Sequence, residues 1–166
     1  MNKTPSKNFV FVGLIFTSLS SIFVKLSDSP SIIISAYRML FASLLWVIPV
    51  LIKDREELKK ITISDLLWCF VSGVFLALHF ATWIASLSMT SVASSTVLVS
   101  LSPVFVAAFS YFILKEDLKL RSIIGIAVAL GGSILIAFGD SQGGGHALKG
   151  DILALFGAFF VGGYLL

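Results

Sequence analysis

Long apolar stretches separated by short polar loops dominate this chain of 166 residues. A helix needs about 20 mainly apolar residues to cross the hydrocarbon core of a bilayer. Five stretches meet or approach that length, and a sixth opens at Ile152 but falls short of it at Leu166. The pattern therefore predicts an all-α polytopic membrane protein. The five expected spans are Asn8–Ser27, Ser31–Ile52, Asp65–Ser88, Ser91–Leu114 and Ser122–Phe138.

Composition agrees with a membrane protein. The chain is 57% hydrophobic and only 13% charged, whereas soluble domains carry about 25% charged residues. Its net charge of +3 does not indicate nucleic-acid binding, because the basic residues lie in short loops between the apolar stretches. The single cysteine, Cys69, lies in an apolar span and excludes an intrachain disulfide.

Basic residues are distributed unevenly between alternate loops. Cytoplasmic loops collect Lys and Arg, and here the N-terminal tail and the second and fourth loops are basic, whereas loop 88–91 has no charge and 139–150 has only Lys149. We therefore expect a cytoplasmic N-terminus. The basic positions are Lys3 and Lys7, then Lys53, Arg55, Lys59 and Lys60, then Lys115, Lys119 and Arg121.

The first span has an alternative interpretation as a cleaved signal peptide, because two lysines precede an apolar run that contains the small pair Ser20-Ser21. The apolar run continues beyond these serines, which favours a retained helix. An odd number of spans also means that a homologous second copy would enter the membrane from the other side. The similar patterns of Phe11–Phe16 and Leu155–Phe160 suggest such a copy, although two unrelated membrane helices would also match.

Polar residues inside the third span form a stripe at helical spacing that contains His79 and Trp83. His79 falls near the middle of the span, where an ionisable group is costly and usually faces a bundle interior or a wet cavity. It either lines a cavity or hydrogen-bonds a neighbouring helix. A metal site is not expected, because the one other histidine, His146, falls in an expected outer loop.

The fourth span is rich in hydroxyl groups, among them Ser95, Thr96 and Ser102, and Pro103 stands near its centre. Proline removes a backbone hydrogen bond and disfavours helix at the preceding residue. Interrupted helices near the midplane are where transporters bind substrate. Pro103 is therefore either a functional hinge at a cavity wall or a kink that improves packing.

The fifth span carries small residues at every fourth position, which predicts a smooth face for close helix packing. These residues are Gly125, Ala129, Ser133 and Ala137. Arg38, about 10 Å into the second span at 1.5 Å per residue, is too deep for easy snorkelling. It either reaches the outer interface through a strained extension of its side chain or faces a cavity, where it would pair with Asp28 or attract an anionic substrate.

Motifs of soluble chemistry are missing from the sequence. It has no phosphate-cradling loop and no His-Glu-x-x-His pair, and its acidic residues lie in loops and at span edges. We expect no enzyme activity, no metal and no cofactor.

The stretch Ala77–Ala85, continuing through Thr90–Ser95, resembles the EamA-type branch of the drug/metabolite transporter superfamily. The resemblance extends over Ser102–Phe105 and the turn at Lys115–Leu118, where Lys-Glu-Asp replaces the more usual Gly-Glu-Arg. It implies a bacterial plasma-membrane transporter of ten helices in two inverted halves. The central cavity would be walled by helices three and four, which carry His79, Trp83, Ser95, Thr96 and Ser102.

The resemblance predicts three parts: an EamA-like five-helix domain over residues 1–140, an external Gly-rich linker over 141–150, and the truncated start of a second repeat (helix six) over 151–166. The expected function is a secondary transporter, an exporter of small organic solutes such as metabolites, amino acids or drugs. The alternative is a non-transporting membrane subunit or a homo-oligomerising half-transporter. Expected partners are lipid, a small-molecule substrate and a second five-helix half, in cis or as a homodimer, but no nucleic acid.

Overall fold

The computed structural model describes residues 7–141 and 145–166, and within these ranges every regular element is a helix. The expectation of an all-α chain is therefore confirmed for the described part. The elements are α1 Lys7–Lys25, α2 Ser31–Lys53, α3 Arg55–Leu58, α4 Ile63–Met89, α5 Val92–Val99, α6 Ser102–Phe109, the π-helix η1 Ser110–Leu114, α7 Leu120–Ser141 and α8 Gly145–Leu165.

Local sequence signals explain several helix ends. Thr62 and Asp65 form a capping box at the start of α4: each side chain accepts a hydrogen bond from the other residue's backbone N–H. This cap satisfies N–H groups that the first turn leaves without a partner. In the turn that follows α4, the Ser91 side chain caps α5 by accepting a hydrogen bond from the backbone N–H of Ser94. The two caps define the ends of the loop and turn that flank α4.

The fourth expected span is interrupted at its centre. Helix α5 ends at Val99, and α6 begins at Ser102 with Pro103 in its first turn, where proline is well tolerated because the N–H it lacks would have no helical partner there. The break therefore lies at Ser100-Leu101, just before the proline. The span ends in η1, after which Lys115 adopts a left-handed conformation with φ of 57°.

Helix α8 starts earlier than expected. Residues 145–150, expected to belong to an external linker, already form its first turns. Gly150, the last residue of the expected linker, allows α8 to approach the end of α4. With this start, α8 is 21 residues long, and the expectation that the sixth stretch falls short of a span is wrong.

Among the described residues, four segments are long and apolar enough to cross a membrane: Ser31–Lys53, Ile63–Met89, Val92–Leu114 and Gly145–Leu165. Shorter apolar stretches lie in α1 and α7, over Phe11–Lys25 and Leu120–Leu135. The outward faces of α2 and α4 carry exposed large apolar side chains such as Trp46 and Trp68, each 71% exposed. These faces suit contact with lipid.

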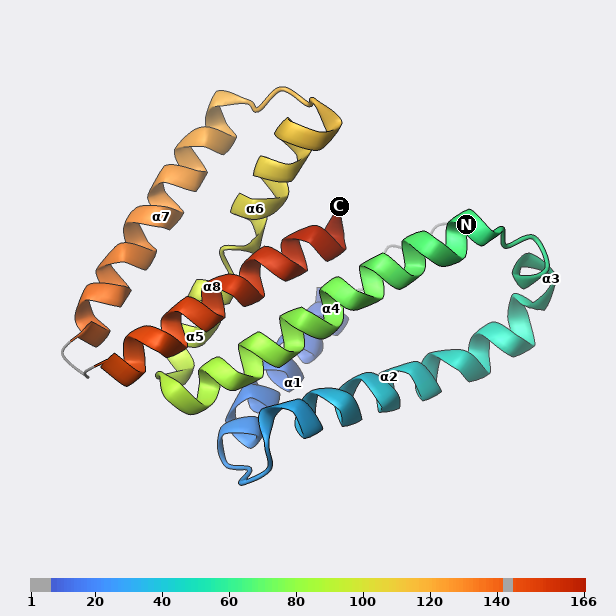
Figure 1. Cartoon of the computed structure of the whole chain (residues 1–166), viewed down its shortest axis with the longest axis horizontal. Helices are drawn as coiled ribbons and strands as arrows, with labels where there is room; N and C mark the ends of the chain where they lie inside the picture. Colours follow the sequence, from blue (N-terminus) through green and yellow to red (C-terminus); the bar gives the residue numbers. More distant parts are fainter. Residues whose placement is uncertain (1–6, 142–144) are drawn as a thin grey trace.

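The turns lie at two ends of the bundle (Figure 1). The α1–α2 and α4–α5 turns and the start of α8 lie toward the lower left of the view, and at the opposite ends of the splayed helices α3 lies at the right and the α6–α7 loop at the top. Helix α8 runs through the middle, against α4 on one side and α5 and α6 on the other. It is the most buried of the four candidate spans, and its residues Ala154 and Ala158 join Leu98 and Leu101 in a buried core.

Glycines explain how α8 reaches this position. A Cβ added at Gly150 would lie 2.8 Å from Thr90 Cβ, and one added at Gly162 would lie 2.8 Å from Phe105 Cβ. Such distances are shorter than Cβ contacts allow, so only glycine fits at these positions. Together with Ala154 and Ala158, these residues give α8 a small residue at every fourth position, the pattern of closely packed membrane helices.

The stripe expected to pack α7 behaves differently along its length. Ala129 packs against the core around Leu98, and Ser133 is buried. Gly125, however, has open space around it: an added Cβ would meet nothing within 4 Å. The side chain of Ala137 lies outside the described part of the structure. Close helix packing through glycine is thus a property of α8, whereas α7 uses only part of its stripe in this structure.

Candidate functional site

A cavity of about 340 Å³ lies among α1, α2, α4 and α5. Each helix contributes polar side chains to it, and the break after α5 contributes Ser100. Most of its exposed wall is nonetheless apolar, a usual property of small-molecule pockets. The lining residues are Thr17, Ser18, Ser21, Arg38, His79, Phe80, Trp83, Thr96, Val99 and Ser100.

Arg38 enters this cavity from α2, as one of the two sequence hypotheses expects. Its Nη1 donates a hydrogen bond of 2.9 Å to Ser20 Oγ on α1. Its Cζ lies 5.1 Å from the ring centroid of Phe80 and 5.4 Å from that of Trp83, within the range of cation–π attraction. The described residues contain two ion pairs, both in the α3 region, and neither includes Arg38. The alternative pairing with Asp28 is therefore absent from this structure.

His79 lies on the same wall and joins α4 to α8. Its Nδ1 is 2.8 Å from the carbonyl oxygen of Gly157. Because a carbonyl only accepts, Nδ1 carries the proton, and Nε2 is left as an acceptor in the neutral ring. The two interpretations of His79 are thus compatible, since the residue both lines a cavity and holds a neighbouring helix.

Trp83 completes an aromatic group with His79 and Phe80. The imidazole of His79 stacks on the Trp83 ring with centroids 6.0 Å apart and an interplanar angle of 8°. Trp83 is only 6% exposed, and its Nε1 has no hydrogen-bond partner among the described residues. A buried N–H without a partner is uncommon and is a recognised feature of functional sites. Trp83 is therefore the least satisfied buried side chain in the cavity wall.

Three predicted site residues lie away from this cavity. Ser95 is fully buried between α4 and α5, where its Oγ is 2.5 Å from Ser86 Oγ, and Ser86 in turn donates to the carbonyl of Trp83. Ser102 and Pro103 start α6 beyond the break, and Pro103 lines a separate groove beside Gly125 on α7. Of the predicted hydroxyl residues, Thr96 alone lines the cavity, because Ser95 bonds to α4 and Ser102 lies beyond the helix break.

Sequence reasoning missed the hydroxyl residues of α1. Thr17, Ser18 and Ser21 line the cavity, and Ser20 binds Arg38. The sequence did contain an indication of these residues, because they form a cluster of hydroxyl side chains within one apolar stretch.

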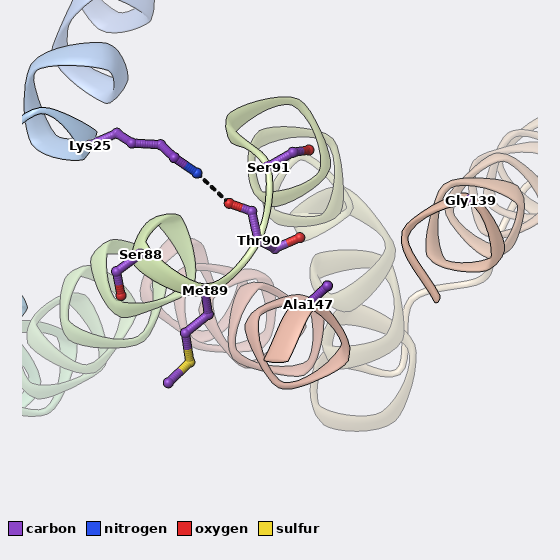
Figure 2. Close-up of a pocket in the computed structure, with 7 residues that line it drawn as sticks. All are labelled: Lys25, Ser88, Met89, Thr90, Ser91, Gly139 and Ala147. Atoms are coloured by element: carbon purple, nitrogen blue, oxygen red, sulfur yellow. Dashed lines mark hydrogen bonds between the residues drawn. The ribbon is translucent and has the colours of Figure 1, made fainter. Parts of the chain in front are cut away.

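A second polar network ties the helices together at the end that holds the α4–α5 turn. Figure 2 shows Lys25 reaching from the end of α1 to the carbonyl of Thr90, with Nζ 2.6 Å from the oxygen. The hydroxyl of Thr90 donates a 2.8 Å hydrogen bond to Oδ1 of the buried Asp151 on α8. These three residues, the Lys25 network, join α1, the α4–α5 turn and α8, and two of them, Lys25 and Thr90, line an open pocket of about 380 Å³.

A comparison with models of known protein families shows to which family this chain belongs. The model of the EamA-like transporter family matches residues 8–138. The chain belongs to this family. It is therefore an integral membrane protein of a transporter family, and the family expected from the sequence is confirmed. Comparisons with curated proteins and with solved structures gave no match.

The region that matches the EamA-like family model includes all the residues that line the cavity, and it ends before α8. Yet α8 supplies the carbonyl that holds His79 and the carboxylate of the Lys25 network. The candidate site of the EamA-like chain therefore depends on a helix outside the matched region. No group of three His, Cys, Asp or Glu side chains that could hold a metal occurs among its described residues.

Proposed function

We propose that this chain is the substrate-binding part of a secondary transporter that exports small organic solutes by alternating access. The observation that carries the proposal is the cavity between α1, α2, α4 and α5, in which Arg38, His79 and Trp83 converge within the apolar spans. Ionisable groups inside a membrane are costly and mark substrate or ion pathways. A cavity of about 340 Å³ is at the small end of the range of ligand pockets.

The proposal includes the bacterial plasma membrane and a cytoplasmic N-terminus. The basic loops support this orientation, because the α2–α4 and α6–α7 loops, which hold most of the Lys and Arg, both lie at helix ends opposite the α4–α5 turn. The Lys25 network would then face the outside. In this orientation the network ties α1, the α4–α5 turn and α8 together on the external side, as expected of a state closed to the exterior.

The proposal also includes a second five-helix half that inserts in the inverted sense. The open space at Gly125 and the groove beside Pro103 give α6 and α7 a face that another helix could approach closely. Such a half would complete the second wall of a central cavity.

Transport by the full-length protein in proteoliposomes tests the proposal. Efflux of labelled solutes from a panel of amino acids, organic acids and amines should exceed that of empty liposomes. Trp83→Phe should reduce efflux, because it changes the cavity wall. Trp68→Phe is the matched control on the same helix, since Trp68 is 71% exposed and lies away from the cavity.

Equal efflux from both variants, at equal amounts of inserted protein, would remove the cavity from the mechanism. Efflux of every solute at the rate of empty liposomes would refute transport itself.

A further inference from the structure

We propose that the cavity selects small organic anions, with Arg38 as the group that binds the anionic end. This inference rests on the proposed function, because it names the substrate class of the same cavity. It starts from a charge imbalance. Arg38 brings a permanent positive charge, and none of the described residues that line the cavity is Asp or Glu.

Arg38 is held in place but not neutralised. Ser20 takes one N–H of the guanidinium, and the rings of Phe80 and Trp83 flank its Cζ at 5.1 and 5.4 Å. The described structure gives the remaining N–H groups no acceptor, and no carboxylate pairs with them. A guanidinium presents parallel N–H donors that match a carboxylate or phosphate. The side chain is thus positioned for an anionic ligand while its charge remains available.

The hydroxyl groups of the cavity divide into donors and acceptors. Thr17 and Ser100 each donate to a backbone carbonyl at 2.8 Å, which leaves their oxygens as acceptors. Ser18 and Thr96 donate no hydrogen bond within the described structure, so their protons are available to a ligand. Donors near Arg38 favour an anion, and the acceptors accommodate a hydroxyl or amide elsewhere on the ligand.

The same features disfavour organic cations. A ligand cation would meet the Arg38 charge in a poorly solvated site, with no carboxylate among the described lining residues to offset the repulsion. The cavity volume of about 340 Å³ also limits the ligand to a small solute.

Calorimetric titration of the full-length protein in detergent with matched probes tests this inference. The probes are butyrate, benzoate and phenylacetate, each compared with its amide and with the amine of the same carbon skeleton. We expect at least one carboxylate to bind about tenfold or more tightly than its amide and its amine, a difference of about 1.4 kcal/mol. Binding of no carboxylate, or equal binding of the three head groups, would overturn the proposal. This comparison needs no variant, so it stands even where a substitution impairs folding.

Two substitutions then assign the preference to Arg38. Arg38→Gln should abolish the tenfold preference for the carboxylate and leave amide binding unchanged, whereas Arg38→Lys should keep part of it. Arg55→Gln removes the same charge from an exposed position in α3 and should leave the preference intact. An undiminished preference in Arg38→Gln would contradict the assignment.

Transport and substrate class fail in different ways. Efflux of amines or neutral solutes without carboxylate binding would refute the anion site and leave transport standing. Carboxylate binding that depends on Arg38, without efflux of any solute, would support the anion site and refute transport.

Discussion

The position of α8 in the middle of the bundle makes a sharp prediction about Gly150. A Cβ at this residue would lie 2.8 Å from both the Cβ and the backbone nitrogen of Thr90, and 2.9 Å from Met89 Cβ. A backbone nitrogen cannot rotate away as a side chain can. Gly150→Ala should therefore push α8 away from the end of α4.

A second glycine in a helix supplies the matched control. Gly73, within α4, has nothing within 4 Å of an added Cβ. Replacing glycine by alanine inside a helix stabilises it by about 0.5–1 kcal/mol, and this gain applies to both sites. The difference between the two variants therefore isolates the packing cost, for which overpacked cores give about 1–3 kcal/mol.

We expect the upper end of that range, because the contact is with backbone. Gly73→Ala should raise the free energy of unfolding by about 0.5–1 kcal/mol, and Gly150→Ala should lower it by about 2 kcal/mol. Gly157→Ala should fall between them, since its Cβ would lie 3.3 Å from Val99 Cγ2 and 3.4 Å from two other side-chain atoms. Side chains can adjust by a few tenths of an ångström.

Equilibrium unfolding in mixed micelles of dodecyl maltoside and sodium dodecyl sulfate, followed by tryptophan fluorescence, measures these differences. The order of stability should be Gly73→Ala, then Gly157→Ala, then Gly150→Ala. A Gly150→Ala protein as stable as the Gly73→Ala protein would refute the close approach of α8 to the α4–α5 turn.

Further predictions concern the site and the orientation. His79→Ala should lower the free energy of unfolding by about 0.5–1.5 kcal/mol, because it removes the side-chain hydrogen bond that joins α4 to the carbonyl of Gly157 on α8; His146→Ala, at the exposed start of α8, is the control and should be neutral in the same unfolding assay. Ser95→Ala should cost about 0.6 kcal/mol, the average for a hydrogen bond between membrane helices, and a loss of several kcal/mol would contradict the isolated hydroxyl pair. With the native cysteine replaced by serine, Ser29→Cys should react with a membrane-impermeant maleimide in intact cells and Glu57→Cys only after permeabilisation. The reverse labelling would overturn the proposed orientation.

Much of the helical framework was predictable because bilayer thickness imposes a length on each apolar stretch. The second expected span began at the observed first residue of α2 and ended one residue before its last, Lys53. Arg38, His79 and Trp83 were predictable as cavity residues because polar side chains deep in a span need a partner or a cavity. The details of the hydroxyl-rich span were not predictable. Its face changes across the break at Ser100-Leu101, so helical spacing fails there.

The start of α8 was not predictable from glycine content alone. Glycine suits both a flexible linker and a close helix contact, and the sequence around Gly150 contains a run of three glycines that favours the first interpretation. What distinguishes the two is a partner surface, here Thr90 and Met89, which lies about 60 residues away in sequence. Ser20 is a similar case: its partner Arg38 lies on another helix, and a serine in an apolar stretch gives no sign of that contact.

The central place of α8 has a consequence for the order in which the protein is made. During synthesis α4, α5 and α6 enter the membrane before α8 does, so the surfaces that will hold Gly150, Gly157 and Gly162 first face lipid or insertion machinery. His79 then has no carbonyl to bind, and Lys25 and Thr90 have no Asp151 to join. The first helices therefore form an incomplete assembly, and its polar groups gain hydrogen-bond partners only when α8 packs against them. Helix α8 completes the packing of the other helices, and a mutation on its small-residue face would therefore appear in cells first as a defect in biogenesis.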